Sequence, residues 1–390
     1  MITVDEALAR VFDLARPMPV EDVPLAEAAG RVLAQTVNAT RDQPPFAASA
    51  MDGYAISETD VSAGDRFTVI GEAAAGHGFA GALAGGQAVR IFTGAPLPEN
   101  ATRVIIQEDT TRSGNVVTLG GNLDAARHIR PAGADFRAGA SLEAPQILRP
   151  ADIALLAAMN IATVPVARQP DVALIATGDE LVMPGEAPRP DQIIASNTFG
   201  LKAMIEAAGA LVRVLPIARD TAASLHTAFA LARGADLIVT IGGASIGDHD
   251  LVAPVAEELG MQRAFYKIAM RPGKPLMAGR IADSAMIGLP GNPVSSMVCG
   301  KLFILPLVRA MLGLGRLPCV RQQRPLDHDI GANGPREHYM RARLTETGIA
   351  AFDRQDSALL SVLHQADALL IRPAGDGART AGEIVDYIAI

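Results

Sequence analysis

Residues 237–250 read LIVTIGGASIGDHD and reveal the most about the fold of this chain. The run Leu237–Ile241 is apolar and β-branched, which favours a buried strand, and the glycines after it favour a tight loop ahead of a helix. This alternation predicts a parallel sheet with helices on both faces. The same order is expected in three other units. The first has a strand Val172–Ala176, a loop Thr177–Glu180 and a helix near 197–208, and the second has a strand Leu211–Ile217 and a helix Thr221–Arg233. The third has a strand Ala285–Gly288, a loop 289–293 and a long helix.

The regions on either side of these units have other patterns. Residues 1–34 carry apolar side chains at helical spacing, so we expect a first helix there and a second, short helix over Pro24–Leu33. Residues 57–130 hold short apolar runs between Gly and Pro clusters, which is typical of a small all-β domain. A helix is expected over Ala151–Asn160, and β structure from about residue 318 onward.

A length of 390 residues suggests about two to four domains. We predict a multidomain α/β protein whose centre is a three-layer α/β domain over residues 169–318. The other predicted parts are an N-terminal helical and linker domain (1–41 plus 132–168), an inserted β domain (42–131) and a C-terminal β-barrel-like domain (319–390).

The composition of the chain limits the kinds of molecule and surface that it is expected to bind. The formal net charge is −8, aromatic residues make up 4% and tryptophan is absent, which argues against nucleic acid and an anionic membrane surface. The most apolar stretch, Pro293–Leu314, contains Lys301 and Arg309 and is predicted to be a buried helix rather than a membrane span. The N-terminus lacks the pattern of a signal peptide, so we expect a cytoplasmic protein. Neither Cys299 nor Cys319 has a CxxC partner, which makes a disulfide scaffold or a thiolate metal site unexpected.

One stretch has a charge opposite to that of the whole chain. Met261–Arg280 contains five cations and no acid, and two of the only four lysines, Lys267 and Lys274, lie in it. Compact lysine charges beside Arg271 suit a phosphate or another oxyanion. The glycine loops add to this interpretation, because backbone N–H groups and helix N-termini beyond the carboxyl ends of strands bind phosphates. A solvated strand and turn would explain the same charges, and this alternative stays open.

Four acids, Asp179, Glu180, Asp248 and Asp250, lie on the same loops. Carboxylates repel a phosphate unless a divalent cation lies between them, so Mg²⁺ is the expected cofactor. Capping of helix N-termini is the alternative role, above all for Asp248. The loops contain no GxxxxGK[ST] sequence, and no GxGxxG follows the first strand of the α/β units, which argues against a Walker-type NTPase and a dinucleotide dehydrogenase.

Six short motifs follow one another along the chain. They are Ser49–Ala55 (SAMDGYA), Thr93–Pro96 (TGAP), Thr177–Leu181 (TGDEL), Gly242–Asp248 (GGASIGD), Arg271–Pro275 (RPGKP) and Gly288–Ser295 (GLPGNPVS). In this order they resemble the molybdopterin molybdotransferases, the MoeA family that includes the E domain of gephyrin. Each motif alone is weak, whereas six in order are specific. The sequence departs from the usual family pattern at Ala134, where an acid is common, and at Ala244.

The resemblance implies insertion of molybdate into adenylylated molybdopterin, with Mg²⁺-dependent release of AMP. It implies that the central domain binds molybdopterin, that Asp52, Glu180 and Asp250 are catalytic, and that Glu180, Asp248 and Asp250 hold the metal. Substrate contacts are implied for Thr93, Asp135, Thr177, Gly178, Asp220, Gly242, Gly243, Ser245, Gly247, Lys267, Arg271, Lys274, Pro290, Asn292 and Pro293.

The resemblance also implies an elongated homodimer in which the inserted β domain brings Asp52 and Thr93 to the site of the partner chain. The expected protein partners are the molybdopterin adenylyltransferase and cofactor-accepting proteins. Two alternatives remain: a catalytically altered paralogue or scaffold of the same fold, which the acids Asp52, Glu180 and Asp250 disfavour, and an adenylylating enzyme, which the additional domains disfavour.

Overall fold

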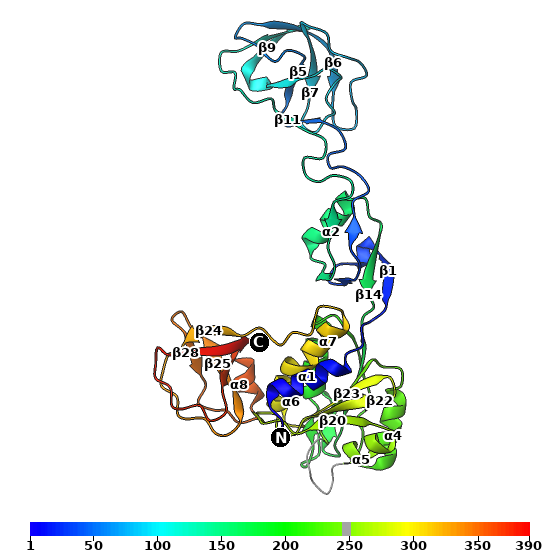
Figure 1. Ribbon diagram of the computed structural model, residues 1–390, viewed down its shortest axis with the longest axis vertical. Helices are drawn as coiled ribbons and strands as arrows, with labels where there is room; N and C mark the ends of the chain where they lie inside the picture. Colours follow the sequence, from blue (N-terminus) through cyan, green and yellow to red (C-terminus); the bar gives the residue numbers. More distant parts are fainter. Residues whose placement is uncertain (244–250) are drawn as a thin grey trace.

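The computed structural model describes residues 1–243 and 251–390. Figure 1 shows an elongated molecule. The sheet with β5, β6, β7 and β9 lies at one end, a smaller sheet with α2 lies in the middle, and the largest sheet lies at the other end beside the C-terminal sheet. The prediction of a multidomain α/β protein is therefore confirmed, while the limits of its four domains stay predictions.

The largest sheet has six strands in the order β18-β15-β19-β23-β22-β20. The first four are parallel and match the predicted strand units, and their bounds are β18 (Leu211–Val214), β15 (Asp171–Ala176), β19 (Leu237–Ile241) and β23 (Ser284–Leu289). Parallel neighbours need crossover connections, which these strands obtain from helices. The crossover helices are α3 (Asn197–Ala207), α4 (Ala222–Leu231) and α5 (Val252–Glu258).

Helices cover both faces of this sheet, as predicted. Along β15, Val172 and Leu174 pack into a core shared with α1 (Val4–Leu14), α3 and the long helix that begins at Pro293. The intervening Ala173 and Ile175 pack on the other face, against α4 and α5. Alternate burial on two faces explains why every residue after Asp171 in β15 is apolar and buried.

The prediction of a wholly parallel sheet is wrong at one edge. The strands β22 (Met277–Ile281) and β20 (Gln262–Tyr266) are antiparallel to their neighbours. Residues 282–283 join β22 to β23 in a tight turn, and a connection that short can only reverse the chain. The cationic stretch 261–280 therefore forms much of the antiparallel edge of the sheet.

The prediction of helix over residues 1–34 is correct only for α1, which Thr3 caps at its N-terminus together with Glu6. The chain then forms β1 (Val20–Pro24), a short 3₁₀ turn (Leu25–Glu27) and β2 (Val32–Leu33) instead of a second helix. Pro17, Pro19 and Pro24 disfavour helix, and β1 gains an antiparallel partner in β14 (Thr163–Ala167). The four-stranded sheet is β1-β14-β2-β13 (Gln146–Ile147), and the predicted helix α2 (Pro150–Ala158) packs beside it.

The inserted region forms a six-stranded sheet in the order β8 (Arg103–Ile106), β5 (Gly53–Ile56), β7 (Gln87–Ile91), β6 (Arg66–Ala73), β10 (Val116–Leu119) and β9 (Thr110–Ser113). Its apolar runs are strands, as predicted, and a 3₁₀ turn (Gln107–Asp109) joins β8 to β9. Two short pairs connect it to the middle sheet, β3 (Val37–Asn38) with β12 (Ser141–Leu142) and β4 (Ala48–Ser49) with β11 (Ile129–Arg130).

The C-terminal sheet takes one strand from the cationic stretch. Its order is β21 (Met270–Arg271), β25 (Glu337–Leu344), β27 (Ala368–Arg372), β28 (Ile384–Ala389) and β24 (Gln322–Pro325), with β26 (Ile349–Ala351) beside β25. A short helix, α8 (Leu360–His364), precedes β27. Because β21 pairs with β25, residues 270–275 are shared between the central and the C-terminal domains.

The apolar helix predicted to be buried is a core element. It runs as α6 (Pro293–Cys299), a π turn (Gly300–Ile304) and α7 (Leu305–Met311). By length and composition alone its 19 residues could cross a membrane, but 72% of its most apolar segment is buried inside the protein. Cys299 lies within it, fully buried and without a disulfide.

Candidate functional site

A cleft of about 720 Å³ lies at the carboxyl ends of β15, β19 and β23. Three loops that follow these strands line it, together with the first residues of α3. Open α/β sheets bind ligands at this edge. The predicted residues that meet here are Thr177, Gly178, Glu180, Asp220, Gly242, Gly243, Pro290, Asn292 and Pro293.

The wall of the cleft after β19 requires glycine. Gly242 has φ +96° and Gly243 has φ +63°, in the region that L side chains rarely adopt. A Cβ atom on Gly242 would lie 2.8 Å from the backbone O and the Oγ1 of Thr177, and one on Gly243 would lie 2.2 Å from Cγ2 of Val252. Thr177 in turn donates its backbone N–H to Ile241 O at 3.0 Å. Two neighbouring loops therefore touch backbone to backbone.

The loop after β15 is held from behind by Arg219, which sequence reasoning missed. Its Nη1 donates to the carbonyl oxygens of Gly178 (3.4 Å), Asp179 (3.1 Å) and Leu181 (3.2 Å). The Asp179 carboxylate accepts the N–H of Asp220 at 3.3 Å, so it braces the loop and does not line the cleft.

Glu180 differs from Asp179 because its carboxylate lies in the cleft. It is exposed and folds over Gly178, where a Cβ would meet Glu180 Oε2 at 2.2 Å. Its backbone O accepts the N–H of Ile193 at 2.8 Å, but among the described residues its carboxylate accepts no hydrogen bond, which argues against the capping alternative for this residue. Asp220 lines the same cleft, so two carboxylates face the space where a ligand would bind.

The side-chain amides of two asparagines connect the remaining walls of the cleft. Asn197, the first residue of α3, donates Nδ2–H to Gly291 O at 2.7 Å, and Asn292 donates Nδ2–H to Ser357 Oγ at 3.1 Å. The N-terminus of α3 faces the cleft through Ser196, Asn197 and Thr198. Free N–H groups and positive potential at that terminus favour an anion.

A second pocket, of about 370 Å³, adjoins the cleft, and Pro275 and Asn292 line both. We call it the cationic pocket. The predicted Arg271 and Lys274 line it, and so does Arg336 of the C-terminal domain. The other lining residues are Pro272, Gly273, Ser295, Gln355, Asp356 and Ser357. Three cations and one acid give it a net positive charge.

The loop that carries Lys274 is tightly constrained. Gly273 has φ +106°, and a Cβ there would lie 2.4 Å from the buried Cys299 Sγ. The backbone N–H of Ile268 donates to Lys274 O at 3.0 Å, and β21 pairs with β25. Lys267 is not brought to either cavity among the described residues; its Nζ lies 5.2 Å from the centre of the Tyr266 ring.

Buried basic groups lie behind the cationic pocket. Arg341 is fully buried, and only its Nη2 has acceptors, the carbonyls of Arg354 (3.3 Å) and Asp356 (2.9 Å). Burial, and after it the charge of Arg271, lowers the pKa of Arg341 to about 10 although Asp356 opposes the shift. Burial, followed by Arg271 and other arginines, also lowers the pKa of His338 to about 4. The surroundings are therefore strongly positive.

Asp52 and Thr93 form a separate constellation on the inserted sheet. The Asp52 carboxylate accepts the backbone N–H of Thr93 at 2.7 Å and its hydroxyl at 2.8 Å. These hydrogen bonds, backbone first, lower the pKa of Asp52, and Arg90 adds to the effect. Figure 1 places β5, which follows Asp52 directly, at the opposite end of the molecule from the central sheet. Asp135 is exposed on the connection between them, so one chain does not bring these three residues to the cleft.

Four predicted residues, Ser245, Gly247, Asp248 and Asp250, lie outside the described residues. Within residues 1–243 and 251–390, no group of three or more His, Cys, Asp or Glu side chains could hold a metal ion. The pair Glu180 and Asp220 is nevertheless a plausible donor set, since Mg²⁺ is commonly held by one or two carboxylates together with substrate phosphates.

Another cavity, of about 730 Å³, lies at the opposite edge of the central sheet, where Asp236 and Ser284 stand at the starts of β19 and β23. Its acids Asp236 and Asp283 already pair with Arg168 and Arg16. None of the described residues of the glycine loops lines this cavity. We therefore assign the site to the carboxyl edge.

Comparison with known proteins agrees with this geometry. Residues 2–160 match the MoeA N-terminal region (domain I and II), residues 173–310 match a probable molybdopterin binding domain, and residues 323–390 match the MoeA C-terminal region (domain IV).

Relatives match along most of their length. The molybdopterin molybdenumtransferase of Haemophilus influenzae is 36% identical over 317 residues, which cover 80% of this chain and 78% of that protein. That of Nostoc sp. is 35% identical over 382 residues, covering 94% and 87%. The solved structure of a molybdopterin biosynthesis MoeA protein from Pyrococcus horikoshii has a TM-score of 0.86 at 30% identity and covers 100% of this chain and 99% of that chain. The resemblance seen in the six motifs is thereby confirmed, and this chain belongs to the MoeA family.

Proposed function

We propose that this chain is a molybdopterin molybdenumtransferase that inserts molybdate into adenylylated molybdopterin and releases AMP. The observation that supports this most is the pair of adjoining cavities, a glycine-walled cleft and a cationic pocket, which share Pro275 and Asn292. Such a reaction needs one place for a phosphate-bearing pterin nucleotide and an adjacent place for a small oxyanion.

The cationic pocket suits molybdate. A tetrahedral dianion needs compact positive charge and several donors, which Lys274, Arg271 and Arg336 offer. The hydroxyls of Ser295 and Ser357 add neutral donors on the same walls. Among the described residues Asp356 is the only acid on these walls, which leaves them an excess of two positive charges and matches the charge of the anion.

The cleft suits the phosphates of the pterin nucleotide. Gly242 and Gly243 permit close approach of backbone to ligand, and the N-terminus of α3 offers N–H groups to phosphoryl oxygens. Lys274 lines the cationic pocket next to Pro275, which lines both cavities, and would stabilise charge that develops as the bond to AMP breaks.

The two carboxylates of the cleft need a cation once phosphates bind. Glu180 and Asp220 would hold Mg²⁺ there, and Asp248 and Asp250 of the family motif are further proposed ligands. When bound, the metal would polarise the phosphoryl oxygens and stabilise charge on the leaving AMP. Arg219 fixes the backbone that carries Glu180 and so sets the direction of that carboxylate.

The distal position of Asp52 supports a homodimer. Two hydrogen bonds from Thr93 hold its carboxylate and favour the ionised form, yet Figure 1 shows β5, which follows Asp52, at the opposite end of the molecule from the central sheet. We propose that Asp52 acts at the cleft of a partner chain. Light scattering should give a dimer at micromolar concentration, and a stable monomer would contradict this.

One assay tests the proposed activity. Adenylylated molybdopterin, molybdate and Mg²⁺ are supplied, and AMP and molybdenum cofactor are measured. Formation of both supports the transferase. Binding of these ligands without turnover would favour the scaffold alternative, and AMP-transfer from ATP to molybdopterin would favour an adenylylating enzyme. The adenylyltransferase and the cofactor-accepting proteins stay proposed partners, and the cytoplasm stays the predicted location.

A further inference from the structure

The wall of the cationic pocket that comes from the C-terminal domain is made of two loops. One loop carries Arg336 and precedes β25, and the other carries Gln355, Asp356 and Ser357 after β26. Both come from a domain that contributes nothing to the strand-end loops of the central sheet. The contacts that hold these two loops in place therefore determine whether the cationic pocket forms.

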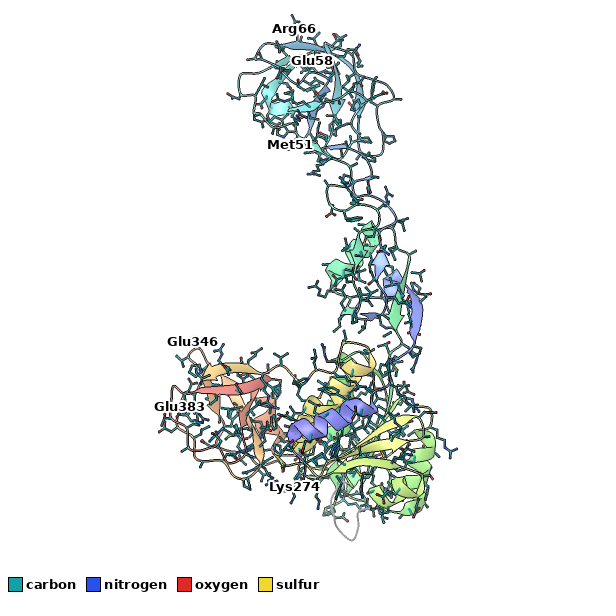
Figure 2. The ribbon with its side chains drawn as sticks, in the orientation of Figure 1. Met51, Glu58, Arg66, Lys274, Glu346 and Glu383 are labelled. Atoms are coloured by element: carbon teal, nitrogen blue, oxygen red, sulfur yellow. The ribbon has the colours of Figure 1, made fainter. Side chains whose placement is uncertain are left out.

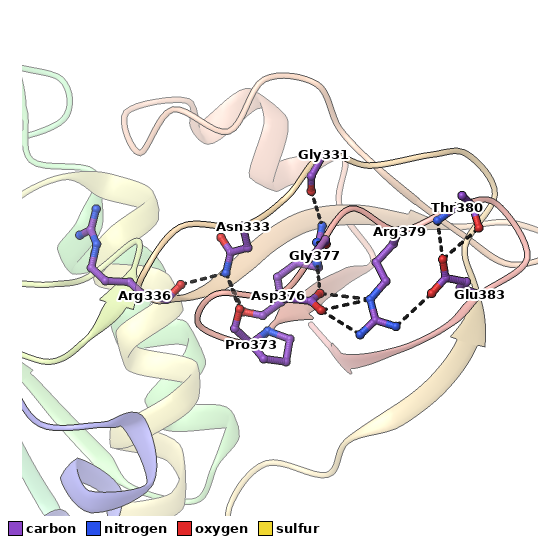
Figure 3. A network of polar contacts seen from close by, with 10 residues as sticks. Gly331, Asn333, Arg336, Pro373, Asp376, Gly377, Arg379, Thr380 and Glu383 are labelled. Atoms are coloured by element: carbon purple, nitrogen blue, oxygen red, sulfur yellow. Dashed lines mark hydrogen bonds and ion pairs between the residues drawn. The ribbon is translucent and has the colours of Figure 1, made fainter.

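The loop before β25 depends on one amide side chain. Asn333 Nδ2 donates to the carbonyl oxygens of Arg336 at 2.9 Å, Arg372 at 3.1 Å and Pro373 at 2.7 Å, and its backbone N–H donates to Asp376 O at 2.8 Å (Figure 3). Asn333 thus binds the backbone of Arg336 to the turn that follows β27. Of the residues on this loop, only Arg336 lines the cationic pocket.

The turn that Asn333 uses as its anchor is itself fixed by ion pairs. The buried Arg372 donates Nε–H to Asp376 at 2.6 Å, and Arg379 pairs with both Asp376 (2.8 Å) and Glu383 (3.0 Å), as Figure 3 shows. Asp376 is 9% exposed. The acceptors of Asn333 are therefore held independently of any ligand.

The guanidinium of Arg336 has few constraints of its own. Among the described residues it forms no ion pair, and its one hydrogen bond is a long one, from Nη1 to Met270 O at 3.4 Å. The positive charge of Arg336 is thus available to bind an anion, whereas hydrogen bonds to the backbone of Arg336 set its position. The other loop is secured separately, since Gln355 and Arg341 exchange hydrogen bonds (3.0 and 2.9 Å).

We infer that Asn333 is a positioning residue for the oxyanion, because it holds the backbone of Arg336, which lines the cationic pocket together with Lys274. The inference rests on the proposed function. It assigns the C-terminal domain a direct part in molybdate affinity, although Asn333 itself does not line the pocket.

The test is calorimetric titration of the full-length protein with sodium molybdate and, separately, with AMP. Asn333→Ala should weaken molybdate binding about tenfold or more and leave AMP binding within twofold. Arg336→Ala should weaken molybdate binding at least as much. Glu383→Gln is the matched control: it breaks the outer ion pair, but Arg372 and Arg379 still hold Asp376 directly, so both affinities should stay unchanged.

The possible results distinguish a failure of the role of Asn333 from a failure of the proposed function. Unchanged molybdate affinity in Arg336→Ala would show that the cationic pocket is not the oxyanion site. A loss in Arg336→Ala without a loss in Asn333→Ala would overturn the role of Asn333. Equal losses for molybdate and AMP, or the same loss in Glu383→Gln, would show that Asn333 only supports the fold.

Turnover gives a second readout that does not depend on calorimetry. Asn333→Ala should raise KM for molybdate while kcat at saturating molybdate stays near wild type, since the anion reaches the same place once bound. Should the alanine variant fail to fold, Asn333→Ser is measured in its place, because it retains a small polar side chain. A fall in kcat with unchanged KM would contradict the inference.

Discussion

The cleft and the cationic pocket adjoin each other but are built on different principles. The cleft belongs mainly to the central domain, with Ala358 added from the C-terminal domain, and backbone, glycine and the start of a helix form much of its walls. The pocket belongs to two domains, and its character comes from the side chains of Lys274, Arg271 and Arg336. The backbone walls of the cleft resist a change in shape. The binding properties of the cationic pocket depend instead on its charged side chains and on the contacts that hold each of them in place. The two cavities should therefore respond differently to mutation.

The largest effect is expected in the cationic pocket. Lys274→Ala removes a compact charge from the wall of the cationic pocket, so turnover at subsaturating molybdate should fall on the order of 10²-fold or more. Steady-state AMP release measures this. Lys202→Ala, on the surface of α3 and paired with Glu206, is the control for loss of a lysine. Comparable losses of turnover in Lys274→Ala and Lys202→Ala would show that the cationic pocket has no special role.

Glu180→Gln should act on the metal rather than on the oxyanion. The variant keeps size and hydrogen bonding but removes charge, so AMP release should fall about 10²-fold and require more Mg²⁺. Glu186→Gln is a near neighbour whose carboxylate caps the backbone of Met183 at 3.0 Å outside the cleft. Wild-type rates for Glu180→Gln across a Mg²⁺ titration would refute the metal role.

Gly242→Ala tests the backbone wall. Both Gly242 and Gly260 have positive φ, +96° and +87°, but a Cβ on Gly260 would meet nothing within 4 Å. The clash with Thr177 should cost roughly 1–3 kcal/mol of folding free energy beyond the shared backbone strain. Thermal unfolding of Gly242→Ala and Gly260→Ala measures the difference. Equal midpoints would mean that the close approach to Thr177 does not constrain the cleft.

The last expected effect concerns pH and the basic groups behind the pocket. Folding lowers the pKa of His338 to about 4 from its usual value near 6.5. The unfolded chain therefore binds more protons between these values, and stability should fall as pH drops from about 6.5 to 4, by on the order of 2 kcal/mol. His338→Gln should flatten this dependence, while the exposed His364→Gln should not. An unchanged pH profile in His338→Gln would contradict the assignment.

The difference between the two cavities also explains what could be read from the sequence. Loops such as Gly242-Gly243 follow their strands directly, so local pattern was enough to predict them and their place at one edge of the sheet. Lys274 was predicted because unpaired positive charge stood out in an acidic chain.

Residues that depend on tertiary pairing could not be predicted in this way. Arg336 reaches the pocket only because β21 pairs with β25, and no local pattern marks it among 34 basic residues. Arg219 braces three carbonyls of a loop about 40 residues earlier. A 3₁₀ turn and the strand β2 replace the helix predicted over Pro24–Leu33, because β13 and β14, which lie far along the chain, pair with β2.

The central claim is that the cleft and the cationic pocket are separate subsites, occupied together. The direct test is a calorimetric titration of the protein with molybdate in the presence of Mg²⁺, with and without saturating AMP. The account predicts that AMP leaves one molybdate site per chain, that Lys274→Ala and Arg336→Ala abolish that site, and that Glu180→Gln spares it. Complete displacement of molybdate by AMP would show a single shared anion site and would contradict the account.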